Sequence, residues 1–561
     1  MGVPGFPAWI NTTFSDISKK ELPKINNFYI DMNSLIHPQA KFVCDNNPDL
    51  INNDENTLEI KIISQCINYL EYIIEIVNPL DTIFIAIDGV APMAKIKHQR
   101  GRRFKFIYDR KVLEHIYYKY NEKIPNIWNT SAITPGTIFM DKLNKTIINW
   151  INNKKYNCKI IFSSSDTIGE GEHKILQHIK TLSESYVMIY GLDADLIFLS
   201  VSSKKNNIYL MRELEEFSYL SIDKLKIVIV EYINEQIDKK LDENIIIDDF
   251  VFLCYLCGND FIPHIPSLNI KPHNKKIQNG LDIIIDAYIN IINNSTIEED
   301  IYILCNNKIN FKFLLKIFRM LSLKENEYFS ILFNNPKKVY NNSCNLEDEK
   351  NDYDNNNINN NNYIYEYYYN HLFDLQLGNQ KLSIIKQKEN YYNLYFEIYN
   401  NSEFNYILEE YVKGLLWTIQ YYYNKCPDYT WYYPHHHAPL ISDLFEYINN
   451  NIEKIENYEK QLNNVELNKY SISSIEQLLL VLPLESHYRL IPKIEIIREN
   501  IKKDYYNYFP KNMLDIKIDS INKKKSWQNI LMIPIIPIKL LKSFIKLKNN
   551  NFIKPYTYEP S

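Results

Sequence analysis

Seven acidic residues in the first 260 positions lie at the ends of hydrophobic runs: Asp31, Asp88, Glu170, Glu172, Asp193, Asp195 and Asp260. Bringing carboxylates together at such positions is costly unless a cation holds them. Carboxylate oxygens suit hard divalent cations, so we expect these acids to bind two Mg²⁺ or Mn²⁺ ions. Two such ions, about 3.5–4 Å apart, form a catalytic centre for the cleavage of phosphate esters.

A run of basic residues follows the second of these acids. Between Lys95 and Lys111 the chain carries eight Lys or Arg residues and only one acid, Asp109. Charge runs often form solvated faces, but such faces usually mix both signs. On a helix, one stripe is shared by the residues at i, i+4, i+7 and i+8, which are Lys95, Gln99, Arg102 and Arg103. We interpret this stripe as an anion site that matches a terminal phosphate.

Each acid also has a plainer structural explanation. Glu170 and Glu172 flank a glycine at a predicted helix start, where the helix dipole favours acidic side chains. Asp193 fits a helix cap, and Asp260 fits a turn cap before Pro263. One shared cation site nevertheless explains acids at five separate element ends better than five unrelated caps do. No nucleophilic Ser or Cys is needed for this chemistry, and the chain carries no Walker A or GxGxxG motif.

Apolar segments alternate with helical patterns through the N-terminal half. Strands are predicted at FYI ending at Asp31, TIFIAI ending at Asp88, CKIIFSS, YVMIYG and NIYLMR. Helices are predicted over Leu58–Val77, from Pro92 to about Lys123, after Gly136 to about Asn152, and within GEGEHKILQHIK. A loop is predicted after Asp31. This order predicts an α/β fold with a mostly parallel central sheet flanked by helices, in which ligands bind beyond the carboxyl ends of the strands.

The composition is that of a folded globular protein with more than one domain. The 561 residues are 45% hydrophobic and 14% aromatic. A net charge of −5 mildly disfavours a nucleic-acid binder. However, net charge is a sum over the whole chain, and clustered carboxylates would cancel the contribution of a local basic groove to it. Eight cysteines show no paired framework. Cys254 and Cys257 lie in an apolar helical run, so we expect core packing from them.

The chain shows no pattern of export or membrane insertion. Its first residues, MGVPGFPAWI, lack the basic and long apolar regions of a signal peptide. Phe6 stands where a myristoylation signal requires Ser or Thr. No run of 18 apolar residues would span a membrane. We expect an intracellular monomer, in the cytoplasm rather than the nucleus, with no membrane partner and with protein partners that the sequence does not indicate.

An Asn-rich, low-complexity segment, residues 341–365, divides the chain. It carries too little apolar surface to fold, so we expect a disordered insertion. We therefore predict a nuclease core over 1–290, a helical connection over 291–340, the insertion, and a second, mainly helical region over 366–561 that packs on the core.

The same residues resemble the XRN family of 5′→3′ exoribonucleases. The stretches that carry the resemblance occur in family order: MGVPGF, DMNSLIH, DGVAPMAKIKHQRGRRF, ITPGTIFM, GEGEHKI, YGLDADLIFLS, DDFVFLCYLCGNDFIPHIPSL, TWYYPHHHAPLISDL and SSIEQLLLVLP. Any one short stretch is weak evidence, whereas the ordered series is specific.

The resemblance implies a PIN/flap-endonuclease-like core in which the seven acids bind the metal ions. It also implies that Lys95, Gln99, Arg102 and Arg103 hold a 5′ monophosphate. His37, in the DMN-x-x-x-H pattern, would stack on the 5′ base, and Trp431 would be its partner. Stacking on aromatic faces tolerates any sequence, which suits an enzyme that degrades RNA of many kinds.

The sequence departs from the family pattern at several positions, and none of them is an expected metal or phosphate residue. Ile168 replaces a Pro before GEGEH, Met93 replaces an Arg, and His436 and His437 replace a His-Tyr pair. The predicted activity is metal-dependent 5′→3′ degradation of 5′-monophosphorylated single-stranded RNA to nucleoside 5′-monophosphates. Two alternatives stay open: a flap-type, structure-specific DNA nuclease and a non-catalytic RNA-binding scaffold.

Overall fold

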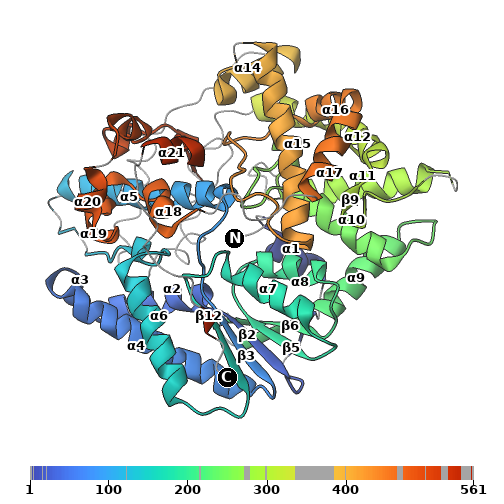
Figure 1. Ribbon diagram of the computed structural model, residues 1–561. Helices are drawn as coiled ribbons and strands as arrows, with labels where there is room; N and C mark the ends of the chain where they lie inside the picture. The colour runs from blue at the N-terminus through green and yellow to red at the C-terminus, as the bar shows by residue number, and fades with distance from the viewer. Residues whose placement is uncertain are drawn as a thin grey trace.

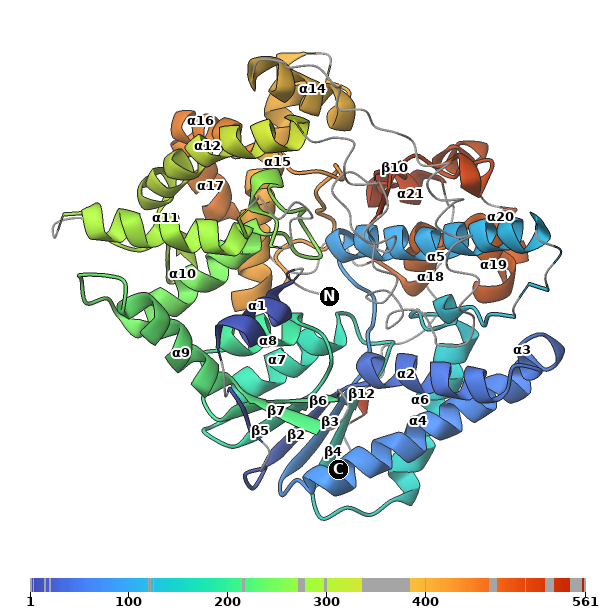
Figure 2. The same ribbon diagram turned by 180° about the vertical axis from the view of Figure 1, so that it is seen from behind.

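The computed structural model describes residues 3, 5–14, 17–19, 22–119, 121, 123–124, 126–213, 217–270, 278–296, 300–334, 384–398, 400–463, 472–499, 501–519, 529–544 and 557–558. The Asn-rich segment at 341–365 lies outside these residues. Figures 1 and 2 show a twisted sheet on one side of the molecule, with helices around it and a second body of helices on the other side.

The sheet has eight strands in the order β1-β7-β6-β5-β2-β3-β4-β12. Their bounds are β1 Ser18–Lys19, β2 Asn27–Asp31, β3 Thr82–Ala86, β4 Lys159–Ser163, β5 Val187–Tyr190, β6 Ile208–Glu213, β7 Phe217–Ser221 and β12 Thr557–Tyr558. The five strands from β6 to β4 run parallel, whereas β7, β1 and β12 join by antiparallel pairing. The predicted mostly parallel α/β sheet is confirmed, with antiparallel strands added at both sides.

Strand register places the ends of the parallel strands side by side. Asp31 pairs with Ala86, Ala86 pairs with Ser163, and Ile30 pairs with Tyr190. The residues that follow these strands therefore leave the sheet along one edge.

Alternating side chains of each central strand enter two separate cores. Tyr29 and Phe84 face one core, and Ile30 and Ile85 face the other. Helices cover both faces because both are apolar. One face packs against α2 Met32–Asn46, α4 Glu55–Val77 and α6 Ile138–Asn153; the other packs against α7 Gly171–Thr181, α8 Asp195–Ser202, α9 Ile222–Asn234 and α10 Glu243–Leu256.

The segment after Asp31 is a helix, and the prediction of a loop there was wrong. Helix α2 begins immediately after the strand, because Asp31 caps it by accepting a hydrogen bond of 3.1 Å from the Asn33 amide. Pro38 in the middle of α2 argued against a helix there, although the buried Met32, Leu35, Ile36, Ala40 and Val43 follow a helical period. The helices predicted at Leu58–Val77 and after Gly136 are present as α4 and α6.

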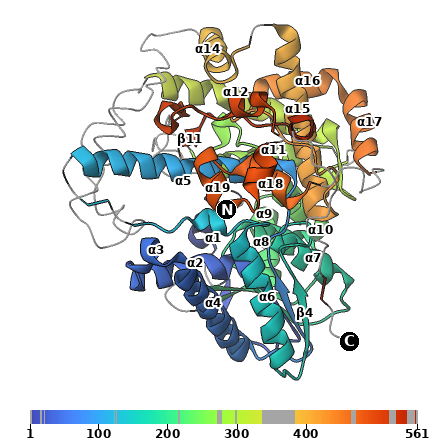
Figure 3. The same ribbon diagram turned by 60° about the vertical axis from the view of Figure 1, so that its left-hand side comes forward.

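The second body is mainly helical. Its elements include α11 Gly280–Asn294, α12 Phe311–Asn334, α14 Ile384–Phe396, α15 Asn401–Tyr423, α16 Ile441–Asn450, α17 Ile452–Asn463, α18 Ser474–Val481, α19 Leu484–Leu490, α20 Ile494–Arg498 and α21 Ile538–Phe544. The group around α15 reaches α8, and α18 packs along α5 Met93–Lys119 (Figure 3).

Helix α5 is fixed to the second body by one buried arginine. Arg100 is 1% exposed and donates hydrogen bonds to the carbonyl oxygens of Leu480 (2.6 Å), Tyr508 (2.8 Å) and Pro534 (3.0 Å). Its guanidinium also lies over the rings of Phe104 and Phe509. Residues far along the chain therefore set the position of α5.

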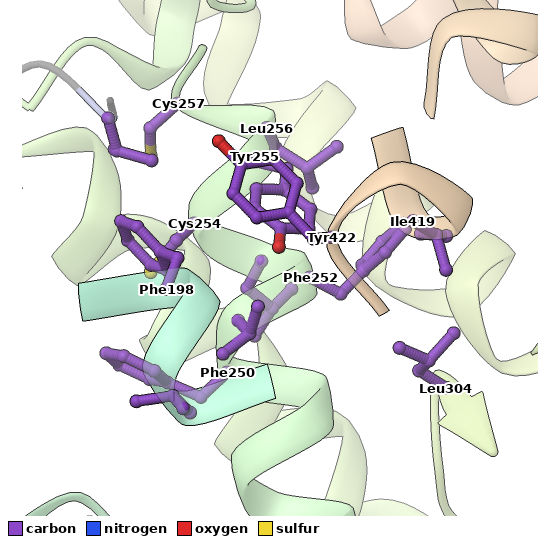
Figure 4. Packing of buried hydrophobic residues seen from close by; sticks show 14 of the residues in the cluster. Phe198, Phe250, Phe252, Cys254, Tyr255, Leu256, Cys257, Leu304, Ile419 and Tyr422 are labelled. Atoms are coloured by element: carbon purple, nitrogen blue, oxygen red, sulfur yellow. The ribbon is translucent and has the colours of Figure 1, made fainter. Parts of the chain in front are cut away.

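Cys254 and Cys257 lie in the apolar core on α10 and just after it (Figure 4). Both are free thiols, surrounded by side chains such as Phe198, Phe250 and Tyr422. The expected core packing of this CxxC pair is confirmed. Among the described helices, none is long and apolar enough to cross a membrane.

Candidate metal and phosphate site

Asp31 and Asp88 meet at the carboxyl edge of the sheet through one asparagine. Asn33 Nδ2 donates to Asp88 Oδ2 at 2.6 Å, while the Asn33 amide donates to Asp31 Oδ1. Ser34 Oγ adds a hydrogen bond of 2.6 Å to Asp31 Oδ2. The first turn of α2 thus orients both carboxylates.

Helix α7 approaches these two acids with a glycine. The Gly171 amide donates to Asp88 Oδ1 at 2.7 Å. A Cβ at Gly171 would lie 3.3 Å from both Asp31 Oδ1 and Asp88 Oδ1, so a side chain there would press on the pair. Glycine therefore lets the start of α7 bring Glu170 and Glu172 to the same edge.

A second group of acids follows β5. Carboxylate oxygens of Glu172, Asp193 and Asp195 all lie within 4.8 Å of one another. Asp195 begins α8, and its amide donates to Asp193 Oδ1 at 3.3 Å. These three residues form a ligand set for a hard cation.

Lys95 joins the remaining acids. Its ammonium lies 2.6 Å from Glu170 Oε1, 2.8 Å from Asp260 Oδ2 and 3.9 Å from Glu172 Oε1. Burial favours the neutral amine, but these acids raise the pKa of Lys95 well above its usual value, so it stays charged. The structure places this member of the basic stripe among the carboxylates, because they attract the nearest cation on α5.

Two acids of the site, Asp31 and Asp195, resist ionisation because they are buried beside other carboxylates. Burial and then the charge of Asp88 raise the pKa of Asp31 to about 7. Burial, followed by Asp260 and Asp193, raises the pKa of Asp195 to about 7. Asp195 Oδ2 is also buried and accepts no hydrogen bond from any described residue. Crowded carboxylates with an oxygen left unsatisfied fit a divalent cation.

The rest of the basic stripe lies further along α5. Arg103 donates to the Ile133 carbonyl at 3.1 Å and to Thr134 Oγ1 at 3.2 Å, whereas the Arg102 side chain is exposed. Gln99 is partly exposed and accepts a hydrogen bond from Gln477 on α18. The stripe therefore presents Gln99 and Arg102 to solvent and anchors Arg103.

His37 lies near this stripe. Burial, then the charges of Arg103 and Arg102, lower the pKa of His37 to about 3, so its ring is neutral near pH 7. Trp431, in contrast, is 8% exposed, lies against Trp417 with ring centroids 5.4 Å apart, and donates to Glu410 Oε2 at 3.2 Å. The structure therefore brings His37 to the basic stripe and puts most of the Trp431 ring in a core.

Two tyrosines of α15 bind site acids and were not predicted from the sequence. Tyr421 OH donates to Glu170 Oε2, and Tyr422 OH donates to Asp195 Oδ1 at 2.7 Å. The run of three tyrosines in QYYYNK was the only available signal, and it is equally typical of a core helix. Asn33 and Ser34 were missed as well, although DMNS directly follows a strand-end Asp.

Comparison with known families defines the class of protein. A family model described as "XRN 5'-3' exonuclease N-terminus" matches residues 1–214, and one described as "Xrn1 helical domain" matches residues 240–371 and 376–552. The chain belongs to the XRN family, as its motifs indicated.

Individual relatives match over nearly the whole chain. A human protein named 5'-3' exoribonuclease 1 is 28% identical over 99% of this chain, and the Schizosaccharomyces pombe protein of that name is 26% identical over 96%. A Debaryomyces hansenii protein named 5'-3' exoribonuclease 2 is 24% identical over 91%. This chain spans 34%, 48% and 64% of the lengths of these three relatives, respectively.

Proposed function

We propose that this protein is a metal-dependent 5′→3′ exoribonuclease. Its substrate would be single-stranded RNA with a 5′ monophosphate, and its products would be nucleoside 5′-monophosphates. The observation that carries the proposal is the convergence of acids from several strand and helix ends beside a helix that carries the exposed Arg102 and the partly exposed Gln99 and Arg103. The printed names of the relatives, 5'-3' exoribonuclease 1 and 2, support the same activity.

Two Mg²⁺ or Mn²⁺ ions would be held by the seven acids, with Asp31 and Asp88 on one side and Glu172, Asp193 and Asp195 on the other. When bound, such ions neutralise charge on the scissile phosphate and lower the pKa of an attacking water. Asp260 and Glu170 are already drawn toward the site by Lys95. Tyr421 and Tyr422 hold Glu170 and Asp195 in fixed orientations, so these acids need little rearrangement on binding.

The 5′ end of the RNA would be held by α5. Lys95, Arg102 and Arg103 would supply charge for a monophosphate, with Lys95 also paired to Glu170 and Asp260, and Gln99 would supply amide donors. A cap or a triphosphate is larger than this group and would be excluded. His37, neutral and beside the arginines, would stack on the first base. Trp431, which is 8% exposed, would be its partner.

The finer features of the proposal rest on the sequence. We propose a monomer that acts in the cytoplasm rather than the nucleus. We also propose the division into a nuclease core over 1–290, a connection over 291–340, an insertion over 341–365 and a helical region over 366–561. Contacts of Tyr421 and Gln477 with core residues support a helical region that works with the core rather than apart from it.

Incubation with RNA that carries a labelled 5′ phosphate, with Mg²⁺ or with EDTA, tests the activity. A labelled mononucleotide as the first product, formed only with Mg²⁺, would support it. Matched RNA with a 5′ hydroxyl or triphosphate should be degraded more slowly. Preferential cleavage of a DNA strand at a bifurcated junction would indicate the flap nuclease instead, and binding without cleavage would indicate the scaffold.

A further inference from the structure

A glutamine of the second body lies directly behind the basic stripe. Gln477, on α18, is completely buried, and α18 runs beside α5 (Figures 1 and 3). Its Oε1 accepts a hydrogen bond of 3.1 Å from the Ala91 amide, and its Nε2 donates to Gln99 Oε1 at 3.1 Å. Gln477 and Gln99 are 378 positions apart in the chain.

The chain of hydrogen bonds has one possible direction. A backbone N–H only donates, so Ala91 requires the oxygen of Gln477. The Gln477 NH₂ group must then face Gln99, and it requires the oxygen of Gln99 in turn. A side-chain amide that is symmetric in shape thereby acquires a fixed orientation.

Gln99 consequently turns its own NH₂ group away from α18. No described residue accepts a hydrogen bond from Gln99 Nε2, and the side chain is partly exposed. Gln99 lies one helical turn before Arg102 and Arg103 on α5. The Gln99 NH₂ group, which donates to no described residue, thus belongs to the same face of α5 as the guanidinium groups.

Amide orientation matters for an anionic ligand. A terminal phosphate carries about −1.5 to −2 charges near pH 7 and presents mainly acceptor oxygens. An outward NH₂ group would donate to it, whereas an outward carbonyl oxygen would repel it. The direction of the Gln99 amide therefore decides whether this residue helps or hinders phosphate binding.

We propose that Gln477 is a positioning residue of the 5′-phosphate pocket, acting through Gln99. The inference rests on the proposed function, because it assumes that the stripe on α5 binds the 5′ phosphate. It adds a residue from the second body to that pocket and assigns it a role in the preference for 5′-phosphorylated over 5′-hydroxyl RNA.

Gln477→Met tests the role, since Met matches the length of Gln and lacks the amide. The readout is the ratio of kcat/KM for 5′-phosphorylated and 5′-hydroxyl RNA of one sequence, with the ratio of their Kd values in EDTA as a readout without catalysis. We expect both ratios to fall about tenfold, because a hydrogen bond to a charged group is lost. Cleavage of 5′-hydroxyl RNA should change little.

Three comparisons make the test specific. Leu479→Met, at another buried position of α18, should leave both ratios unchanged. Adding Gln477→Met to Gln99→Met should cause no further fall, because Gln477 acts only through Gln99. If Gln477→Met does not fold, Gln477→Asn replaces it, since its shorter arm cannot span both partners.

The outcomes separate the inference from the proposed function. A wild-type protein that degrades RNA but ignores the 5′ phosphate would overturn the pocket assignment before any variant is made. A wild-type preference that survives in Gln477→Met or Gln477→Asn would overturn the role of Gln477 alone. The role would also be overturned if Gln477→Met lowered the two ratios as much in the Gln99→Met background as in the wild type. The effect of Gln477 would then not depend on Gln99.

Discussion

The hydroxyl of Tyr422 donates a hydrogen bond of 2.7 Å to Oδ1 of Asp195, joining α15 of the second body to the first residue of α8. Both side chains are buried. The opposite oxygen of Asp195 stays without a hydrogen bond from the described residues, so it is the one available to a cation. The second body thus orients an acid of the proposed nuclease core.

Tyr422→Phe should weaken Mg²⁺ binding by about tenfold, because partners that orient metal ligands commonly contribute that much. The measurement is the Mg²⁺ concentration that gives half-maximal cleavage. Tyr423→Phe is the matched control, since this buried neighbour lies near Asp248 rather than near a site acid. Equal Mg²⁺ requirements in the wild type and Tyr422→Phe would contradict the prediction.

Asp193→Ala should abolish cleavage and leave RNA binding largely intact. The change removes one of three acids that share a cation-sized space, while the basic stripe on α5 is untouched. Cleavage assays with Mg²⁺ and binding assays in EDTA, on one RNA, measure the two effects separately. Persistent cleavage would mean that the metal ligands have been assigned wrongly.

Lys95→Met should lower the free energy of unfolding in EDTA by about 3–5 kcal/mol, because removal of one partner leaves buried charges unpaired. Burial already raises the pKa of Glu170 and Glu172 above the unfolded value. An acid whose pKa is higher in the folded than in the unfolded state stabilises the fold at low pH. This stabilisation is lost as pH rises through the folded pKa. The deficit should therefore be larger at pH 8 than at pH 5.5.

Addition of Mg²⁺ should raise the melting temperature of Lys95→Met more than that of the wild type, since the ion would replace the missing positive charge. Thermal unfolding with and without Mg²⁺ at both pH values measures this. Lys105→Met, which breaks a partly buried pair with Asp109 on the same helix and involves none of the site acids, serves as control. A deficit independent of pH and Mg²⁺ would show that Lys95 does not compensate the acids.

Arg102→Ala should reduce the preference for 5′-phosphorylated over 5′-hydroxyl RNA by about 10- to 100-fold, through loss of charged hydrogen bonds. Competition between the two RNAs in one reaction gives the ratio directly. Arg110→Ala, further along α5 and paired with Glu114, should leave the ratio unchanged. If both variants behave alike, α5 acts through its overall charge and contains no specific pocket.

His37→Phe should flatten the dependence of stability on pH. The folded pKa of His37 is about 3, below the value of about 6.5 in an unfolded chain, so the unfolded state binds the extra proton between these values. Wild-type stability should consequently fall as pH drops from 6.5 toward 3, and His37→Phe should lose less. Denaturant unfolding at pH 7 and pH 5 measures the difference; identical slopes would place His37 in solvent.

The sheet and most of the acidic edge were predictable because their signals are local. Asp31 is the last residue of strand β2, and Asp193 lies three residues after the end of β5. Parallel strands bring their carboxyl ends together at one edge of the sheet, independently of the loops. Helix α2 was missed because Pro38 lies in its middle, although its apolar residues follow a helical period. Contacts made by Tyr422 and Gln477 were beyond prediction, because they depend on how helices more than 200 positions away pack onto the core.

The position of Lys95 shows a second reason why part of the site could not be predicted from the sequence. Helical spacing places it on one face of α5, together with Gln99 and Arg102. Which anion it contacts depends on distances between its ammonium and acids from three other elements, and helix periodicity carries no such information. Trp431 is a similar case, since a motif gives its chain position but not how much of its ring the core covers.

Arg100 has a consequence for any attempt to divide the protein. Its guanidinium lies inside the molecule and donates hydrogen bonds to three carbonyl oxygens, all of residues beyond position 479. A fragment that stopped before them would enclose a cation with no acceptors. A truncation at or before Leu480 removes all three acceptors, so it should destabilise the packing of α5 and with it the whole fold, rather than simply shorten the chain.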